Sequence, residues 1–307
     1  MKMKLLNELS CPVCRKSPLE LRRDNKNDKL VCVSCNSSFH IKNGIPYLFV
    51  KSLDRGKVKK HKKEETDRFS KLDCSENSIL VNRPHCYGTV ENFLFHYTLN
   101  ICRNFLGNIK GKRIIDVCCG GGADAEYLHN LGARITGVDI SADYLKCALV
   151  RAKKFNLDIN LVVGDAENLP FKSDYFDYGV IHCGLHHLPN PYDGIKELIR
   201  VSKKGIVIVE SFNSIFTKLF IKLGISNETE AGHPIYRFDK KTLINFLKEN
   251  GLEKYNLKTF FIYTREEPLR IYSFFDNKYL FKVFKFVYKF VNSNGIFGNR
   301  FVLVAHK

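Results

Sequence analysis

The sequence contains no run of eighteen or more apolar residues, and its first ten residues lack the apolar stretch and small-residue cleavage site of a secretory signal. These absences argue against a helical membrane protein and against a secreted one. With 44% hydrophobic and 12% aromatic residues, the chain still has enough apolar side chains for a real core. We therefore expect a globular protein of the cytoplasm.

Acidic residues are scarce relative to basic ones: 32 Asp and Glu stand against 49 Lys and Arg, a formal net charge of +17. Such an excess attracts RNA or an anionic membrane surface through non-specific electrostatics. The excess is largely lysine in a chain also rich in Asn, Ile and Phe, a bias that genome composition produces as well. We therefore expect at most weak contact with RNA or a membrane surface, and no obligate partner.

Four of the eleven cysteines have the spacing of metal ligands. Cys11 and Cys14 form one CxxC pair, Cys32 and Cys35 form another, and 17 residues separate the two pairs. Two tight turns at this distance present four thiolates to one zinc ion, whereas four unrelated buried cysteines are the less common alternative. Four protein ligands leave no position for water, so we expect a structural zinc that stabilises a small β-rich module at residues 1–50. The other seven cysteines are scattered, which favours reduced thiols over a disulfide scaffold.

The module ends in the run FHIKNGIP at residues 39–46. Together with the cysteine pairs, residues 11–50 resemble the Trm112-type zinc ribbon. In that family the ribbon assists methyltransferases, as a separate partner or as a fused domain, and the resemblance implies fusion here. His40 stands where the family usually has proline, and we do not expect it to be a ligand because four cysteines complete the zinc site.

Residues 51–85 are predicted to form a charged linker. Lysines are frequent from Lys57 to Lys63, Glu64 and Glu65 follow, and hardly any residue up to about Asp73 is apolar. This composition predicts a linker or an exposed helix, and it favours a solvated face over an arm that binds nucleic acid. We expect residues 86–307 to form the main domain.

Beyond the linker, β-like runs alternate with helical segments. Short runs rich in β-branched residues occupy residues 113–118, 134–138, 160–163, 178–182 and 205–209. Segments long enough for amphipathic helices occupy residues 123–131, 143–155 and 192–201. The alternation predicts a doubly wound α/β domain, in which helices cover both faces of a parallel sheet.

A glycine-rich turn follows the first of these strands, in the segment RIIDVCCGGG at residues 113–122. Glycines permit a tight turn and a close approach of the backbone to a ligand at the N-terminus of the next helix. About twenty residues further on, Asp139 ends the second strand, where a carboxylate can accept hydrogen bonds from ribose hydroxyls. Dinucleotide sites need GxGxxG spacing, but Cys118 and Ala123 replace the outer glycines, so we do not expect NAD binding.

Two further blocks follow in order, VGDAENLPF at residues 163–171 and DYFD at residues 174–177. Over roughly residues 110–210, the blocks together resemble the class I S-adenosylmethionine-dependent methyltransferases of the UbiE-like type 11 group. That family has a Rossmann-like, seven-stranded sheet, and the resemblance implies the same fold here. Cys118 stands where the first glycine of the family's turn is usual, which narrows the conformations open to the turn.

The resemblance also implies a role for each matching residue. The glycines of the turn would line the methionine part of S-adenosylmethionine, Asp116 would orient its amino group, and Asp139 would hold the ribose diol. Asp165 and the backbone of the next residue would contact adenine. The full set expected to contact the cofactor is Asp116, Cys118, Gly120, Gly122, Asp139, Ile140, Asp165, Ala166 and Cys183.

Methyl transfer from a sulfonium is an in-line displacement, so the protein mainly has to align the nucleophile and exclude water. A base, where the acceptor needs one, would lie in the segment HCGLHHLP at residues 182–189, after the fourth strand. His186 and His187 are the catalytic candidates, although loop histidines more often bond to backbone. A metal site that includes His182 is disfavoured, because Gly184 and Pro189 indicate a loop.

After residue 210 the sequence departs from a minimal methyltransferase. Residues 212–223 and 275–291 are amphipathic, basic and aromatic, which is typical of a helix at a membrane surface or of a lid over an apolar substrate. An ordinary surface helix is the more common alternative for each segment. The polar segment at residues 226–237 predicts a lid or an acceptor-recognition loop, with His233, Tyr236 and Arg237 as its candidate contacts.

Three functions fit these patterns. A methyltransferase for a small-molecule, lipid-linked or saccharide acceptor is favoured by the C-terminal aromatic residues and by the lack of a recognisable RNA-binding fold. An RNA methyltransferase is favoured by the positive charge and the ribbon. The third function is that of a non-enzymatic interaction protein, in which Cys118 marks a decayed cofactor site.

Overall fold

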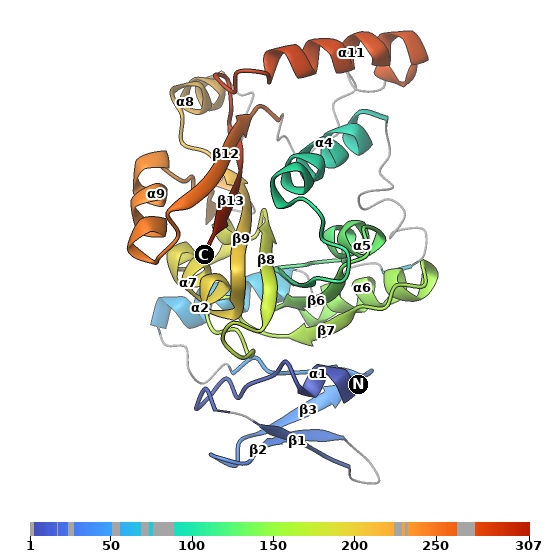
Figure 1. Ribbon diagram of the computed structural model, residues 1–307, viewed down its shortest axis with the longest axis vertical. Helices are drawn as coiled ribbons and strands as arrows, with labels where there is room; N and C mark the ends of the chain where they lie inside the picture. Colours follow the sequence, from blue (N-terminus) through green and yellow to red (C-terminus); the bar gives the residue numbers. More distant parts are fainter. Residues whose placement is uncertain are drawn as a thin grey trace. The chain divides into compact units, whose positions relative to one another are not determined.

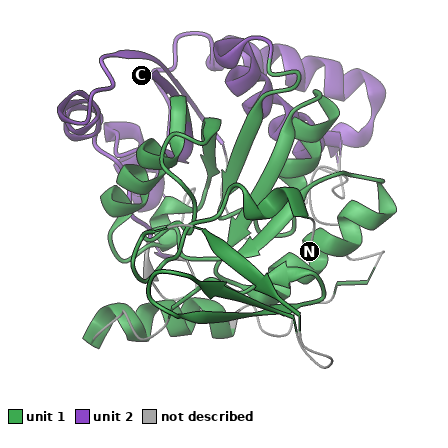
Figure 2. Cartoon of the chain, turned by 60° about the horizontal axis from the view of Figure 1, so that its bottom comes forward, with its two compact units in different colours: residues 1–79, 109–206 green, residues 80–108, 207–307 purple. Residues whose placement is uncertain are grey.

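The structure is a computed structural model that describes residues 3–16, 18–23, 28–50, 56–68, 74–75, 89–223, 229–230, 233–262 and 274–307. The chain divides into two compact units, drawn in green and purple in Figure 2. The first unit comprises Met1–Ile79 and Ile109–Ile206, and the second comprises Leu80–Asn108 and Val207–Lys307. More than half of the predicted linker lies outside the described residues, as do residues 226–228 and 231–232 of the predicted loop at residues 226–237.

The first unit begins with the predicted β-rich module. A short helix, α1 (Met3–Leu6), precedes an antiparallel sheet with the order β1-β2-β3-β4. Its strands are β1 (Leu19–Arg22), β2 (Lys29–Cys32), β3 (Ser38–Lys42) and β4 (Ile45–Pro46). Asn43 and Gly44, which join β3 to β4, have φ angles of 54° and 77°. Two successive left-handed residues make the tight hairpin turn that an Asn-Gly pair favours, so this turn fixes the register of the last hairpin.

The main sheet has seven strands in the order β12-β13-β9-β8-β5-β6-β7, and it confirms the doubly wound α/β fold (Figure 1). Its strands are β5 (Arg113–Val117), β6 (Arg134–Asp139), β7 (Asn160–Val163), β8 (Phe176–His182), β9 (Ser202–Ser211), β12 (Lys254–Phe260) and β13 (Arg300–His306). β5 pairs in parallel with both β6 and β8, whereas β12 and β13 are antiparallel. The chain passes from β5 to β6 and β7 and then returns to β8 on the other side of β5. Ligands of such sheets bind at this reversal, outside the carboxyl ends of the strands.

The helices of the first unit are α2 (Gly56–Arg68), α5 (Ala123–Asn130), α6 (Ala142–Lys154), the 3-10 turn η2 (Leu185–His187) and α7 (Pro191–Val201). Two of them, α6 and α7, begin where the sequence supplies a start signal. The Ser141 hydroxyl accepts a hydrogen bond from the Tyr144 N–H at the start of α6, and Pro191 opens α7. α2 lies inside the predicted linker, so that segment is helical over at least thirteen residues.

The second unit contains α4 (Thr89–Leu106), α8 (Ile215–Lys222), α9 (Lys240–Glu249), the 3-10 turn η3 (Phe274–Asp276) and α11 (Lys278–Val291), with the short strands β10 (Thr229–Glu230) and β11 (His233–Pro234). α4 packs against β13. α9 ends at a glycine stop, because Gly251 has a φ of 81° and the next N–H donates back to Leu247 O. No helix in the described ranges is both long enough and apolar enough to cross a membrane.

Candidate functional site

The glycine-rich turn follows β5 and uses left-handed backbone at three positions. Cys118, Gly120 and Gly122 have φ angles of 56°, 50° and 78°. Cys118, which replaces the usual glycine, therefore takes a conformation that is costly for a residue with a Cβ, by about 1–2 kcal/mol. A Cβ added at Gly184 would lie 2.4 Å from the Cys118 Cβ, so the loop after β8 needs a glycine where the turn carries a cysteine.

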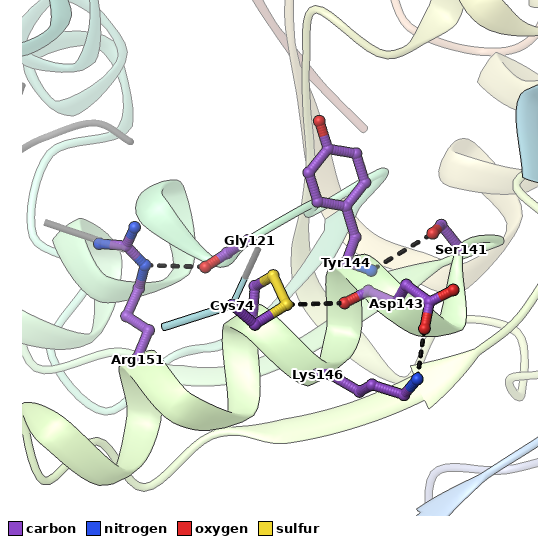
Figure 3. The surroundings of a disulfide bond; sticks show 8 residues. Cys74, Gly121, Ser141, Asp143, Tyr144, Lys146 and Arg151 are labelled. Carbon is purple, nitrogen blue, oxygen red and sulfur yellow. Dashed lines mark hydrogen bonds and ion pairs between the residues drawn. A yellow bond between two sulfur atoms is a disulfide. The ribbon is translucent and has the colours of Figure 1, made fainter. Parts of the chain in front are cut away.

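Helix α6 supports the glycine-rich turn through a buried arginine. Arg151 is 1% exposed, and its Nε donates to Gly121 O at 2.7 Å (Figure 3). Its Nη1 donates to Glu126 Oε2 at 2.8 Å. A Cβ added at Gly122 would lie 3.2 Å from the Ala148 Cβ, which shows how closely α6 approaches the turn. Arg151 was not among the residues predicted from the sequence. Its signal is an arginine three residues after a buried alanine, on the apolar face of α6.

A disulfide between Cys74 and Cys147 ties the segment after α2 to α6 (Figure 3). The expectation of reduced thiols is wrong for this pair. The two cysteines are 73 residues apart in sequence, and only the fold brings their Cα atoms to 4.7 Å. Because Cys147 also lies against Gly121, the disulfide is next to the turn.

Asp116 lies in β5 just before the turn and is 1% exposed. Burial raises its pKa well above the usual value, and the nearby Asp124 carboxylate raises it further. Its Oδ2 atom has no hydrogen-bond partner in the described part of the chain. Buried polar atoms of native proteins almost always have a partner, so this oxygen points to a missing donor.

His182, the last residue of β8, is paired with Asp124. Its Nδ1 lies 3.0 Å and 3.2 Å from the two carboxylate oxygens of Asp124. Burial disfavours the charged ring, but the Asp124 carboxylate outweighs burial and raises the pKa of His182 to about 10. His182 is therefore an imidazolium that offsets the acidic charges around the turn.

Asp139 ends β6 and is held by two backbone donors. Gly120 N donates to Oδ2 at 2.9 Å and Ser141 N donates to Oδ1 at 2.8 Å, and the residue between, Ile140, is partly exposed. Burial raises the pKa of Asp139 to about 6, although the two N–H donors lower it. The Gly120 bond connects Asp139 to the turn, so the structure brings these two predicted cofactor contacts together.

Asp165 and Ala166 follow β7 and are both 6% exposed. Asp165 Oδ1 accepts from Glu167 N at 2.9 Å, and Oδ2 accepts from Lys62 Nζ at 2.6 Å. Lys62 also lies 2.8 Å from Glu167 Oε2. The lysine comes from α2, the predicted linker, and it covers the residues expected to contact adenine.

The same face of α2 contacts the two candidate histidines. His187 Nδ1 lies 3.5 Å from Glu65 Oε2, and the backbone carbonyl of His187 lies 2.8 Å from His61 Nε2. The rings of His186 and His187 are 4.2 Å apart, and His186 is 9% exposed. Lys62 and Glu65 are 6% and 8% exposed, so the prediction of a solvated helix is wrong for this face. The charge run gave no sign that these charges have buried partners.

The four ribbon cysteines form a compact cluster, and their sulfur atoms all lie within 4.8 Å of one another. Cys11 and Cys35 Sγ are 3.6 Å apart, as are Cys14 and Cys32 Sγ. A tetrahedral zinc with Zn–S bonds of about 2.3 Å places its sulfurs about 3.8 Å apart, so the four cysteines fit one structural zinc ion. The cluster is the only such group of potential ligands that the described residues provide.

The two knuckles of the ribbon have the same backbone geometry. The N–H of Arg15 donates to Cys11 O at 2.8 Å, and the N–H of Asn36 donates to Cys32 O at 2.9 Å. Arg15 and Asn36 have φ angles of 61° and 58°. Each residue after a CxxC pair thus turns the chain back around the metal position, as a pair of zinc knuckles requires.

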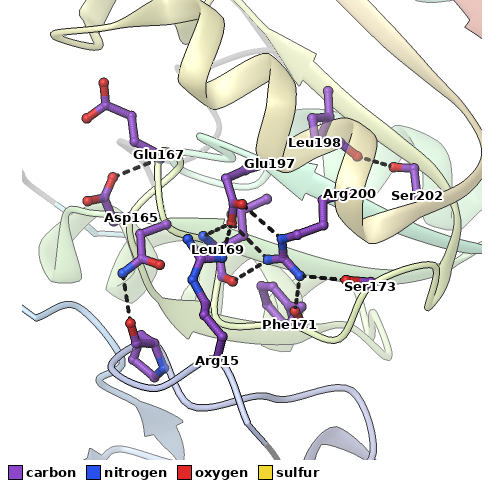
Figure 4. A network of polar contacts seen from close by, with 12 residues as sticks. Arg15, Asp165, Glu167, Leu169, Phe171, Ser173, Glu197, Leu198, Arg200 and Ser202 are labelled. Carbon is purple, nitrogen blue, oxygen red and sulfur yellow. Dashed lines mark hydrogen bonds and ion pairs between the residues drawn. The ribbon is translucent and has the colours of Figure 1, made fainter. Parts of the chain in front are cut away.

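The ribbon also braces the loop that carries Asp165. Arg15 Nη1 donates to Glu197 Oε2 at 2.7 Å, and the same oxygen accepts from Leu169 N at 2.8 Å (Figure 4). Arg200, one turn after Glu197, donates to the carbonyl oxygens of Leu169 and Phe171. Burial raises the pKa of Glu197, but the bonds from Arg200 and Arg15 outweigh burial and leave the pKa below its usual value. One buried carboxylate therefore links a zinc knuckle, α7 and this loop.

Backbone contacts extend this junction. Ser10 N donates to Pro170 O at 3.0 Å, and Leu48 N donates to Val163 O at 2.7 Å. Glu8 is 8% exposed and accepts hydrogen bonds from side chains of β6 and β7. A pocket of about 480 Å³ is lined by ribbon residues and by the Asp165 loop, but by no residue of the glycine-rich turn. We therefore centre the site on the turn, where the unpartnered carboxylate lies, rather than on this pocket.

Known proteins resemble both parts of the chain. Residues 115–209 match the family model described as a methyltransferase domain, and residues 2–44 match the model described as Trm112p-like protein.

Curated relatives match the central region. A demethylmenaquinone methyltransferase of Staphylococcus haemolyticus is 40% identical over 102 residues, which are 32% of this chain and 42% of that protein. A demethylmenaquinone methyltransferase of Renibacterium salmoninarum is 28% identical over 142 residues, which are 43% of this chain and 58% of that protein. The chain thus spans about two fifths to three fifths of the length of these relatives.

A solved structure shares the fold. The magnesium protoporphyrin IX methyltransferase of Synechocystis PCC 6803, with bound SAH, superposes with a TM-score of 0.52 at 15% identity. The superposition covers 80% of this chain and 100% of that one.

Proposed function

We propose that this chain, which joins a methyltransferase domain to a Trm112-like zinc ribbon, transfers a methyl group from S-adenosylmethionine to a small-molecule acceptor. The observation that carries the proposal is the buried Asp116 carboxylate beside the glycine-rich turn, whose Oδ2 lacks a partner among the described residues. Such an unsatisfied atom costs about 1–3 kcal/mol. The amino group of the cofactor's methionine part can donate to this oxygen and offset the cost.

The neighbouring residues suit the other parts of the cofactor. Asp139 uses one lone pair of each oxygen for a backbone N–H, which leaves further lone pairs for two ribose hydroxyls. Gly120 and Gly122 present backbone without side chains. The remaining proposed contacts are Cys118, Ile140, Asp165, Ala166 and Cys183.

When bound, S-adenosylmethionine supplies an activated methyl group on a positively charged sulfur. The chain has to orient the acceptor and exclude water. His182 is held as an imidazolium by Asp124, so it is a poor proton acceptor. Where the acceptor must lose a proton, we propose His187 over the more buried His186, because Glu65 orients the His187 ring.

Lys62 competes with adenine in this proposal, because its ammonium bonds to the carboxylate that would accept from the adenine amino group. Substitution Lys62→Met is expected to strengthen cofactor binding about fivefold, which corresponds to roughly 1 kcal/mol. Lys60→Met, on the same helix but 78% exposed, is the matched control and should leave affinity unchanged. Calorimetric titration measures both variants. Weaker binding by Lys62→Met would mean that the lysine helps to hold the cofactor.

The proposed acceptor is a small molecule of the demethylmenaquinone kind, because the curated relatives that match the central region are demethylmenaquinone methyltransferases. The ribbon would act within the chain, by fixing the loop that carries Asp165, and no obligate partner is needed. We also propose a cytoplasmic location, because eight of the ten described cysteines form no disulfide and Cys74–Cys147 is the single disulfide among them.

Incubation of the zinc-loaded protein with methyl-labelled S-adenosylmethionine tests the proposal. Demethylmenaquinone, a lipid extract and total RNA serve as parallel acceptors. We expect label in the quinone or lipid fraction, lost in Asp116→Asn and kept in Asp158→Asn, an exposed control. Label in RNA alone would favour the RNA methyltransferase, and no transfer with no cofactor binding would favour the non-enzymatic alternative.

A further inference from the structure

Helix α11 buries only one of its faces. Phe281, Phe284 and Tyr288 lie on that face and pack against a cluster on α4 that contains Val90 and Leu94. The Tyr288 hydroxyl donates to Phe261 O at 2.7 Å, which fixes the rotation of the helix. Figure 1 shows α11 in red, with α4 beneath it. The remaining surface of α11 is therefore presented to the surroundings.

The exposed side of α11 is apolar rather than polar. Tyr279, Phe286 and Phe290 are 75%, 73% and 73% exposed, and Val283 is 59% exposed. These positions follow helical spacing, so they form one continuous strip along the helix. Large exposed apolar patches on a protein mark interaction sites. An ordinary surface helix would carry polar residues here, so the more common alternative for this segment fails.

Lysines form a row beside this strip. Lys278, Lys282, Lys285 and Lys289 recur at intervals of four, three and four residues, and the helix contains no Asp or Glu. Lys285 stacks on the Phe281 ring at 4.6 Å from its centroid. The helix thus presents aromatic side chains and an uncompensated positive charge side by side.

Helix α8 and the segment after α11 extend the patch. Ile215 and Leu219 of α8 are 84% and 45% exposed, and α8 adds Lys218 and Lys222. The ring of Phe216 lies 4.7 Å from that of Phe297, which is itself 42% exposed. This ring contact joins α8 to the segment that follows α11, and Figure 1 shows both helices at the same end of the second unit. We call it the α8–α11 surface, and it comprises the exposed residues of α8, of α11 and of positions 296–297.

We infer that the α8–α11 surface binds an anionic lipid bilayer in the plane of its headgroups. Exposed aromatic residues insert at the boundary between headgroups and acyl chains, while the lysine row meets the anionic headgroups. A second copy of the chain fits less well, because it would bring two lysine rows together with no acidic residue on either helix. RNA would satisfy the lysines but leave the aromatic strip in water. The inference does not depend on methyl transfer.

Co-sedimentation of the zinc-loaded full-length protein with vesicles tests the inference. Vesicles of phosphatidylcholine alone are compared with vesicles that also contain phosphatidylglycerol. We expect strong binding to the anionic vesicles, weak binding to the neutral ones, and a loss of binding with added salt. The double variant Phe286→Ser with Phe290→Ser should bind at least tenfold less, because two large apolar side chains no longer insert.

Two double variants with the same net charge test whether the position of the lysines on α11 matters for vesicle binding. Lys278→Gln with Lys282→Gln on α11 should weaken binding to anionic vesicles by roughly fivefold per lysine. Lys241→Gln with Lys248→Gln, at exposed positions of α9, removes the same charge and should have little effect.

Four results would overturn the inference. Two concern vesicles: equal binding by the α11 and α9 lysine variants, and unchanged binding by the serine variant. The third is a dimer in sedimentation velocity that the serine variant abolishes. The fourth is RNA binding that depends on the same aromatic residues.

Discussion

The two units depart from the ordinary distribution of side chains in opposite directions. The first buries charged groups such as Asp116, Lys62 and Arg151, whereas the second exposes large apolar groups such as Phe286 and Phe290. Charged residues normally lie in water and large aromatic residues normally lie in the core. A buried charge therefore needs a partner, and an exposed aromatic patch needs a surface to bind. In the first unit the buried charges are paired with one another, and one carboxylate oxygen of Asp116 has no donor among the described residues. In the second unit we infer a lipid surface.

Loss of zinc should produce the largest difference between the two units, because it should affect cofactor binding by the first and leave vesicle binding by the second unchanged. The ribbon has too small a core to fold without its metal, so a chelator, or Cys11→Ser with Cys32→Ser, should unfold it. The Arg15–Glu197 bond and the Ser10 contact would then be lost, and cofactor affinity should fall more than tenfold, while vesicle binding by the second unit persists. Zinc content, calorimetry and co-sedimentation measure the three results. Cofactor affinity that survives complete loss of zinc would show that the ribbon does not support the site.

Removal of Arg151 should give the next largest effect. In Arg151→Leu, Glu126 remains buried at 5% exposure but loses its ion pair with Arg151, which is expected to cost about 3–5 kcal/mol of unfolding free energy. Lys153→Leu, at an exposed position of the same helix, should change it by less than about 0.5 kcal/mol. Urea unfolding measures both. Equal stability of the two variants would mean that the Glu126 carboxylate is less buried than the structure shows.

The pH dependence of cofactor binding should show a smaller effect through Asp139. Its pKa of about 6 in the folded protein lies above the usual value of 3.8, so its stabilising contribution to folding is present below pH 3.8 and is lost as the pH rises through 6. Cofactor binding has the opposite trend, because the ionised carboxylate accepts better from ribose hydroxyls. Affinity should fall by about tenfold between pH 7.5 and pH 5. The Asp139→Asn variant should lose most of this dependence in calorimetric titrations, and an unchanged slope would assign the titration to another group.

Substitution of the exposed aromatic residues should have the smallest effect on folding. Phe286→Ser with Phe290→Ser should shift the unfolding free energy by less than about 0.5 kcal/mol per residue, because both side chains are largely in water. Tyr288→Ser, on the buried face of the same helix, should cost about 3 kcal/mol. Thermal unfolding compares them. A large loss in the double variant would mean that these side chains are covered within the chain itself.

Features fixed by local sequence were predicted correctly. The paired CxxC spacing predicted the sulfur cluster, and the alternating pattern predicted the strands β5 to β9 within a few residues of their observed ends. The glycine-rich turn and Asp139 were both expected to contact the cofactor, and the Gly120–Asp139 bond joins them. In each case the deciding information lies within a short stretch, as a ligand spacing, a hydrophobic period or a turn residue.

Features that depend on distant pairing were not predicted. Lys62 looked solvated because a charge run does not reveal that Asp165, 103 residues later, will bury it. The Cys74–Cys147 disulfide was missed for the same reason, and so was the buried Arg151–Glu126 pair. The sequence did indicate two amphipathic segments after residue 212, but only the packing of α11 on α4 revealed which of its apolar residues remain exposed.

The most direct test of the proposed cofactor site is calorimetric titration of the zinc-loaded protein with S-adenosylmethionine, in parallel with Asp116→Asn. We expect micromolar binding by the intact protein and binding at least tenfold weaker in the variant, because the uncharged amide oxygen accepts from the charged amino group more weakly than a carboxylate does. No binding by the intact protein, or equal binding by the two, would contradict it.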